Sequence, residues 1–163
     1  MTLKIDMHTH VAPRPAVEIA ESGGIWHGVE FFRDKNDKLT TSYGDLKMSL
    51  PWPKKMETPD ERIKSMDDRN IDMHILSISP LLHWHGLDNE NAISYARDVN
   101  DDISNYASIN RDRFKSFCFL PLQNPEESVI ELERCVNTKQ MLGAMVATNI
   151  NGMDWDNPAL YPV

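Results

Sequence analysis

Apolar and polar residues alternate along this chain in a pattern that predicts short strands separated by amphipathic helices. Four segments are short, rich in apolar or β-branched residues and followed by a loop that contains Pro, Asn or Gly. These predicted strands are 3–8 (LKIDMH), 72–79 (DMHILSIS), 116–121 (SFCFLP) and 143–149 (GAMVATN). Because helical patterns lie between them, the order predicts an α/β fold with a parallel sheet and right-handed crossovers.

The predicted helices have clear start signals. Thr58 is expected to cap a helix that begins at Pro59, with Glu61 completing a capping box and Asn70 ending it in a left-handed conformation. Apolar residues at helical spacing predict two further helices, over 89–110 and 124–136.

The segment 23–57 interrupts this alternation directly after the first strand. Its sequence VEFFRDKNDKLTTSYG predicts a β-hairpin that turns at 35–38. The insertion is either a surface excursion or a flap over a site at the end of the first strand, and the sequence leaves both open.

The last residues, DNPALYPV, have the Asn-Pro start of another helix and stop within its first turn. A single turn is not stable alone, and four strands are half of the eight that close a (βα)8 barrel. We therefore expect residues 1–163 to be the N-terminal part, about four βα units, of one longer barrel domain.

Composition narrows the possible partners. With 25 acidic and 17 basic residues, the net charge of −8 disfavours nucleic acid and anionic membranes as partners. No apolar run approaches the roughly 20 residues of a membrane span, and no apolar signal segment follows the start. We expect a cytoplasmic protein whose Cys118 and Cys135 are reduced core thiols.

The first strand carries the candidate chemistry. Asp6, His8 and His10 alternate along LKIDMHTH, so all three should project from one side of the strand. The two histidines lie at the strand's carboxyl end, where barrel active sites are built, and two neighbouring imidazoles can bind one divalent ion. His-x-His alone is a weak signal, but this position strengthens it.

Four blocks of the chain, one of which contains the two histidines, resemble the sequence of a known family. The stretches KIDMHTHVAP, RIKSMDDRNIDMHILSIS, RFKSFCFLPLQNPEESVIELERCV and GAMVATNINGMDWDNPALYPV together resemble the amidohydrolase superfamily. The resemblance is to the branch of 2-amino-3-carboxymuconate-6-semialdehyde decarboxylase and γ-resorcylate decarboxylase. It implies a metal-dependent (βα)8 barrel, with zinc most common and manganese in some members, and His8 and His10 as metal ligands. It also implies that further ligands and the catalytic residues come from later strands.

Other residues are candidates to line a substrate pocket. Trp84 and His85 follow the second strand, so they should lie at the same end as the metal, where Trp84 could contact an aromatic substrate. Arg14 could bind a substrate carboxylate, and Asn149 could offer a polar group, although a loop or turn role fits each equally well. Where the family places a carboxylate-binding arginine, this chain offers only Lys47.

The neighbouring histidines fit plainer roles better. A second metal site at His83 and His85 is possible, but a pocket-lining loop is the better interpretation. His74, within the second strand, is expected to be a packed core histidine.

The resemblance and the residues together imply a metal-dependent decarboxylase that acts on a small carboxylated, aromatic-derived substrate. The alternatives are a metal-dependent hydrolase of a cyclic amide, ester or lactone, and a non-catalytic half-barrel that binds a partner. Because the first and fourth strands should each present an unpaired edge, we expect a homo-oligomer or association with the other half of a barrel.

Overall fold

The computed structural model describes residues 2–49 and 57–163. Its helices are α1 (Arg14–Ser22), α2 (Pro59–Asp68), α3 (Asn89–Ser108) and α4 (Pro125–Lys139), with 3-10 turns η1 (Pro80–Leu82) and η2 (Pro158–Leu160). Its strands are β1 (Ile5–Val11), β2 (Gly24–Trp26), β3 (Val29–Arg33), β4 (Leu39–Tyr43), β5 (Leu46–Ser49), β6 (Met73–Ile78), β7 (Phe114–Ser116), β8 (Asn149–Ile150) and β9 (Met153–Asp154).

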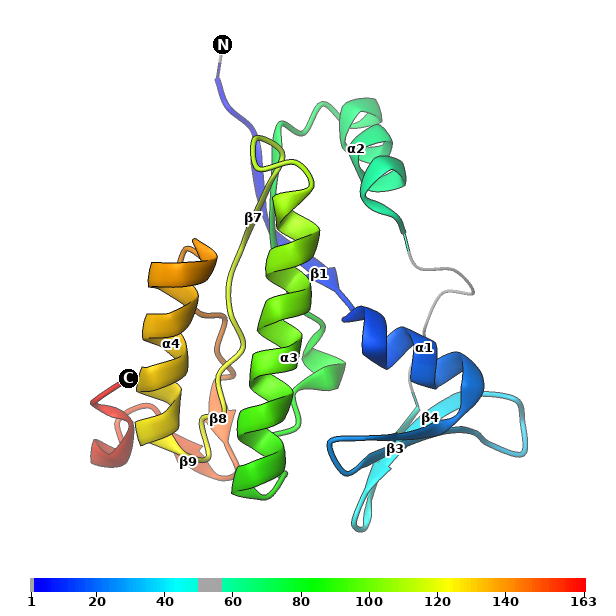
Figure 1. The fold of residues 1–163 in the computed structure, drawn as a ribbon, viewed down its shortest axis with the longest axis vertical. Helices are drawn as coiled ribbons and strands as arrows, with labels where there is room; N and C mark the ends of the chain where they lie inside the picture. Colours follow the sequence, from blue (N-terminus) through cyan, green and yellow to red (C-terminus); the bar gives the residue numbers. More distant parts are fainter. Residues whose placement is uncertain (1, 50–56) are drawn as a thin grey trace.

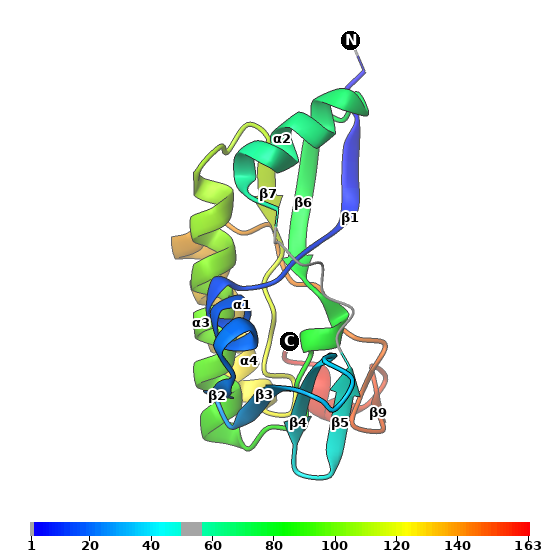
Figure 2. The ribbon, with the colours of Figure 1, turned by 90° about the vertical axis from the view of Figure 1, so that its right-hand side faces the viewer.

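The main sheet is parallel, in the order β1-β6-β7, so strands that follow one another as βα units lie side by side. Helices α3 and α4 lie together on one side of β6 and β7 (Figures 1 and 2). The core between these layers contains Tyr95, Phe114, Leu76 and Ile103, all fully buried. This is the arrangement predicted for consecutive βα units of a barrel.

The third and fourth predicted strands differ from the observed ones. Regular pairing with β6 covers Phe114–Ser116, so β7 begins two residues before the predicted segment. The fourth segment, 143–149, forms only a parallel bridge between Cys118 and Ala144. Its last residue pairs instead in the β8–β9 hairpin. A strand with a partner on one side only has few ladder hydrogen bonds, and Gly143 at φ +149° further weakens the extended run.

The predicted helix ends that rested on capping residues agree with the structure. Thr58 Oγ1 accepts the Glu61 N–H, the Glu61 carboxylate accepts the Thr58 N–H, and Asn70 adopts φ +54°. Asn124 likewise caps α4 by accepting the N–H of Glu127. Helix α1 was not predicted, because its short apolar face lies beside two prolines.

The insertion is larger than the single hairpin expected. Strands β2 to β5 form a four-stranded antiparallel sheet, and the turn between β3 and β4 falls at 34–38, where Asp34 and Lys38 exchange hydrogen bonds. Residues 50–56, at the end of the predicted insertion, lie outside the described residues. His27 links this sheet to α3, since its Nε2 lies 2.8 Å from the Asp98 carboxylate and its Nδ1 lies 2.9 Å from Ser94 Oγ.

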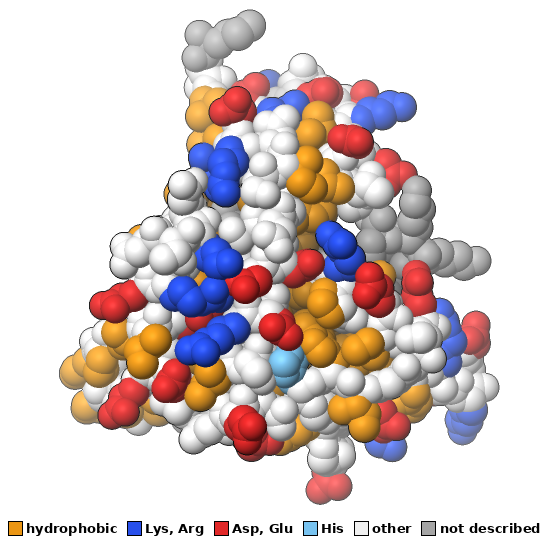
Figure 3. Space-filling model, viewed as in Figure 1, with side chains coloured by type: hydrophobic (Ala, Val, Ile, Leu, Met, Phe, Trp, Pro, Cys, Tyr) orange, Lys and Arg blue, Asp and Glu red, His pale blue; other side chains and the backbone are white. Residues whose placement is uncertain are grey.

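The surface over the helices carries charges of both signs. Basic and acidic side chains are interspersed there with apolar ones on the face shown in Figure 3. Within residues 2–49 and 57–163, no helix combines the length and apolarity that a bilayer crossing requires. Cys118 and Cys135 are free and buried.

Candidate functional site

The two imidazoles of β1 lie next to each other at its carboxyl end. The ring centroids of His8 and His10 are 4.9 Å apart, with the ring planes at 79°. The register of β1 against β6 shifts between Asp6 and Thr9, and the Asp6 carboxylate accepts the peptide N–H of His8 at 3.0 Å. Asp6 therefore holds the backbone of His8 rather than its ring. His8 is exposed, whereas His10 is half-buried.

His10 is held at two points. Its Nδ1 lies 3.1 Å from Ser77 Oγ on β6, and its carbonyl accepts a hydrogen bond from Arg62 Nη2 of α2 at 3.1 Å. Burial lowers the pKa of His10, and the charge of His8 lowers it further; the Ile78 backbone opposes this, and the charge of Arg62 adds a smaller lowering. A neutral imidazole is the form that binds a metal ion.

The Arg62 side chain is nearly buried, which requires compensation for its charge. Its Nε lies 3.4 Å from a Glu57 carboxylate oxygen, and its guanidinium carbon lies 5.8 Å from the centre of the Tyr106 ring. Arg62 thus connects α2 and α3 to the end of β1. The sequence interpretation missed this residue, and an arginine in the first turn of a helix, where its charge opposes the helix dipole, was the available signal.

A second imidazole pair follows β6. The His83 and His85 rings have centroids 5.7 Å apart, and His85 stacks on Phe119 at 5.3 Å. Burial, and then the charges of His85 and His10, lower the pKa of His83 to about 4. His83 and His85 follow the carboxyl end of β6, and β6 runs parallel to β1, so both pairs lie at the same end of the sheet, where Asn151 Nδ2 donates to the His85 carbonyl at 2.5 Å.

This second pair has ring nitrogens without a hydrogen-bond partner among the described residues. They are His83 Nε2, both ring nitrogens of His85, and also the indole Nε1 of Trp84. Buried polar atoms are nearly always paired in folded proteins, so these atoms, at the same end of the sheet as His8 and His10, are candidates to bind a ligand.

The remaining predicted residues are not brought to the histidines by any described contact. Arg14 is exposed at the start of α1, where its peptide N–H donates to the Asp102 carboxylate of α3 at 2.9 Å. Lys47 is exposed on β5, in the inserted sheet. Asn149 has the turn role, because its side chain accepts the Gly152 N–H and donates to Asp154. His74 is buried within β6, as expected of a core histidine.

The geometry suits part of a metal site. Two adjacent imidazoles are suitable nitrogen donors for a divalent transition metal, and the depressed pKa of His10 favours its neutral form. No group of three or more His, Cys, Asp or Glu residues able to hold a metal is found in the described part of the chain. His8 and His10 therefore fit two positions of a ligand set, not a closed site.

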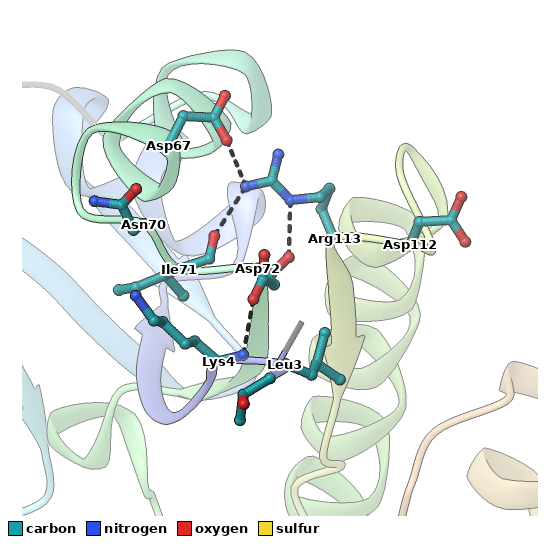
Figure 4. Close-up of a pocket in the computed structure, with 9 residues that line it drawn as sticks. Leu3, Lys4, Asp67, Asn70, Ile71, Asp72, Asp112 and Arg113 are labelled. Atoms are coloured by element: carbon teal, nitrogen blue, oxygen red, sulfur yellow. Dashed lines mark hydrogen bonds and ion pairs between the residues drawn. The ribbon is translucent and has the colours of Figure 1, made fainter.

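A cavity of about 580 Å³ lies at the opposite end of the sheet. It is lined by the start of β1 and the residues before β6 and β7, including Lys4, Asp72 and Arg113 (Figure 4). Arg113 is already bound by the Asp67 carboxylate at 2.7 Å and by two backbone carbonyls. Arg113 and the Asp72 carboxylate, which accepts the Lys4 N–H, are therefore engaged in contacts that hold the ends of the strands together.

Comparison with known proteins places these features in context. A family model described as "Amidohydrolase" matches residues 5–163. The 2-amino-3-carboxymuconate-6-semialdehyde decarboxylase of Dictyostelium discoideum is 29% identical over 164 residues, covering 99% of this chain and 45% of that protein. The γ-resorcylate decarboxylase of a Polaromonas species is 33% identical over 116 residues, covering 69% of this chain and 34% of that protein.

A solved structure shows the same fold. The dihydroxybenzoic acid decarboxylase of a Polaromonas species, with bound manganese and the inhibitor 2-nitroresorcinol, matches at a TM-score of 0.69 and 24% identity. The match covers 99% of this chain and 45% of that chain. The chain therefore spans about half, or less, of the length of the proteins it matches.

Proposed function

The chain belongs to the amidohydrolase family, with the fold of the N-terminal part of its (βα)8 barrel, and from this premise we propose that it carries part of the metal site of a decarboxylase. The proposed substrate is a small carboxylated aromatic or aromatic-derived compound. The observation that carries the proposal is the contact of the His8 and His10 rings at the carboxyl end of β1. The decarboxylase names of the two curated relatives support the reaction class.

His8 and His10 are the proposed ligands of a divalent metal. Zinc is our first choice, because imidazole is a common zinc ligand, and the manganese of the Polaromonas structure supports the alternative. When bound, such an ion polarises a substrate oxygen and stabilises the negative charge that develops as CO2 leaves. Within the chain, Ser77 and Arg62 orient His10, and Asp6 holds the backbone of His8.

The loop after β6 is the proposed wall of the substrate pocket. Within the described part of the chain, Trp84, His83 and His85 have buried polar atoms without a hydrogen-bond partner there, and Phe119 adds an aromatic ring next to both histidines. Aromatic walls suit a flat substrate, while imidazole N–H groups suit its carboxylate or hydroxyl oxygens. Arg14, Lys47 and Asn149 stay predictions as further substrate contacts, and the insertion at 23–57 stays the proposed flap.

The remaining catalytic groups are expected from parts of the fold that the relatives have and this chain does not span. We propose that the functional assembly is a homo-oligomer, because the described β1 pairs with β6 alone and leaves its other edge open. Free, buried Cys118 and Cys135 suit a reducing, cytoplasmic location. The net charge of −8 supports a small-molecule substrate rather than nucleic acid or an anionic membrane.

Metal binding by the two histidines is tested with Mn²⁺ and NMR on this chain. Mn²⁺ should broaden the ring resonances of His8 and His10 before those of His27, which lies in the inserted sheet, and His8→Ala and His10→Ala should each weaken the effect at the other ring. Equal broadening of all three rings would contradict a site at β1.

The reaction is tested on the gene product that carries these 163 residues, loaded with Zn²⁺ or Mn²⁺. CO2 release from 2,6-dihydroxybenzoate or a related hydroxylated benzoate is expected, and it should be lost with His8→Ala. Opening of an ester or lactone without CO2 release from any aromatic acid would replace the decarboxylase proposal with a hydrolase.

A further inference from the structure

We propose that Ser77 fixes His10 in the tautomer that carries its proton on Nδ1, so that the lone pair of Nε2 is free for the metal. This makes Ser77 a positioning residue, and its purpose rests on the proposed function. The juxtaposition that carries the proposal is a chain of contacts from His10 Nδ1 to Ser77 Oγ, at 3.1 Å, and from Ser77 Oγ to the Thr9 carbonyl, at 3.3 Å.

Which group donates in each of these two hydrogen bonds follows from counting the available hydrogens. A serine hydroxyl has one hydrogen, and a carbonyl oxygen can only accept. If the Ser77 hydrogen is donated to the Thr9 carbonyl, then Ser77 Oγ can only accept from His10, and Nδ1 must carry a proton. The reverse arrangement, in which Ser77 donates to Nδ1, makes one of the two hydrogen bonds and leaves the Thr9 carbonyl without that donor.

Burial favours the arrangement that makes both bonds. Ser77 is 2% exposed and Thr9 is 7% exposed, so water has little access to either group. A buried polar group without a partner is costly, whereas a fully paired chain of hydrogen bonds is stable. Thr9 Oγ1 also donates to the Ile75 carbonyl at 3.0 Å, which holds β1 in place against β6 at this point.

The consequence concerns the other ring nitrogen. A metal-binding histidine commonly donates its second ring N–H to a fixed acceptor, which sets both the tautomer and the orientation of the ring. With Nδ1–H held by Ser77, Nε2 is the nitrogen left to bind a metal. The buried Ser77, whose neighbours along β6 are Leu76 and Ile78, thus has a reason to be there.

The tautomer is measured without metal, by long-range ¹H–¹⁵N NMR of the histidine rings at about pH 8, where the imidazole is neutral. The wild-type chain should show His10 with its proton on Nδ1. Ser77→Ala should lower the ratio of the Nδ1–H to the Nε2–H form about fivefold or more, since one hydrogen bond is lost. Ser77→Thr, which keeps the hydroxyl, should retain the wild-type ratio.

Ser79→Ala is the matched control, because Ser79 lies just after the same strand and its side chain makes no capping hydrogen bond. It should leave the tautomer of His10 unchanged. A wild-type His10 protonated on Nε2, or an unchanged ratio in a folded Ser77→Ala chain, overturns the proposal.

A second measurement separates this proposal from the proposed function. Mn²⁺ titration of the same samples should show affinity at His10 reduced about tenfold or more in Ser77→Ala, as for loss of other groups that orient metal ligands. A Ser77-dependent tautomer together with no Mn²⁺ effect at either β1 ring would support the positioning of His10 and refute the metal site. Equal Mn²⁺ affinity of the wild type and Ser77→Ala would refute a role of Ser77 in metal binding.

Discussion

Lowering the pH from 6.5 to about 4 should reduce the free energy of unfolding, and we expect the imidazole of His83 to make a large contribution to this loss. Burial, followed by the charges of His85 and His10, lowers the pKa of His83 from 6.5 to about 4 in the folded chain. The unfolded chain therefore binds a proton more readily than the folded one in this range. The contribution of neutral His83 is fully present above pH 6.5 and is lost as the pH falls toward 4.

The size of the effect follows from the two pKa values. The decrease of the His83 pKa from 6.5 to about 4 means that the folded chain binds this proton less favourably than the unfolded chain, by about 3 kcal/mol. That is a large share of the roughly 5–15 kcal/mol that stabilises a typical domain. His83 should therefore be a major contributor to acid unfolding.

The assay is urea unfolding at a series of pH values for the wild type and His83→Phe. Phenylalanine keeps an aromatic ring beside His85 and Phe119 but cannot take up a proton. Between pH 6.5 and 4 the free energy of unfolding of the wild type should fall by about 3 kcal/mol more than that of the variant. Leu81→Gln, an exposed change in the preceding turn, is the control and should follow the wild type. Parallel stability curves for the wild type and His83→Phe would refute the reasoning.

Two further predictions concern stability and assembly. Asn100→Ala should destabilise the fold by about 3 kcal/mol or more in urea unfolding, because Asn100 is fully buried and bonds both backbone groups of Phe119 and the Glu131 carboxylate; a loss below about 1 kcal/mol would contradict this. Ile5 and Met7 are 46% and 63% exposed on β1, whose second edge has no partner among the described strands, so the double change to Lys should lower the apparent mass in analytical ultracentrifugation. A monomeric wild type would contradict the second prediction.

Elements set by local chemistry were predicted well. The Thr58–Glu61 capping box marks the start of α2 through bonds within one turn, and the alternation around His8 and His10 places both rings on one side of a strand. Such signals involve residues within a few positions of each other, so they are visible in a single sequence.

Elements that depend on distant neighbours were predicted less well. The segment 143–149 looked like a strand, but its partner around Cys118 provides only one bridge, and its end pairs in a hairpin with Met153–Asp154. The insertion contained more strands than its one strong turn signal revealed, because each pairing depends on residues of the whole segment.

The sequence by itself determined the alternation of strands and helices and the candidate ligands, His8 and His10, because periodicity and spacing are local properties of the chain. Only the tertiary structure decided what surrounds His10. Ser77 and His83 are more than 60 positions away in the sequence, and they reach His10 because a crossover brings β6 alongside β1 in parallel. Helix α2, within that crossover, likewise carries Arg62 to the end of β1.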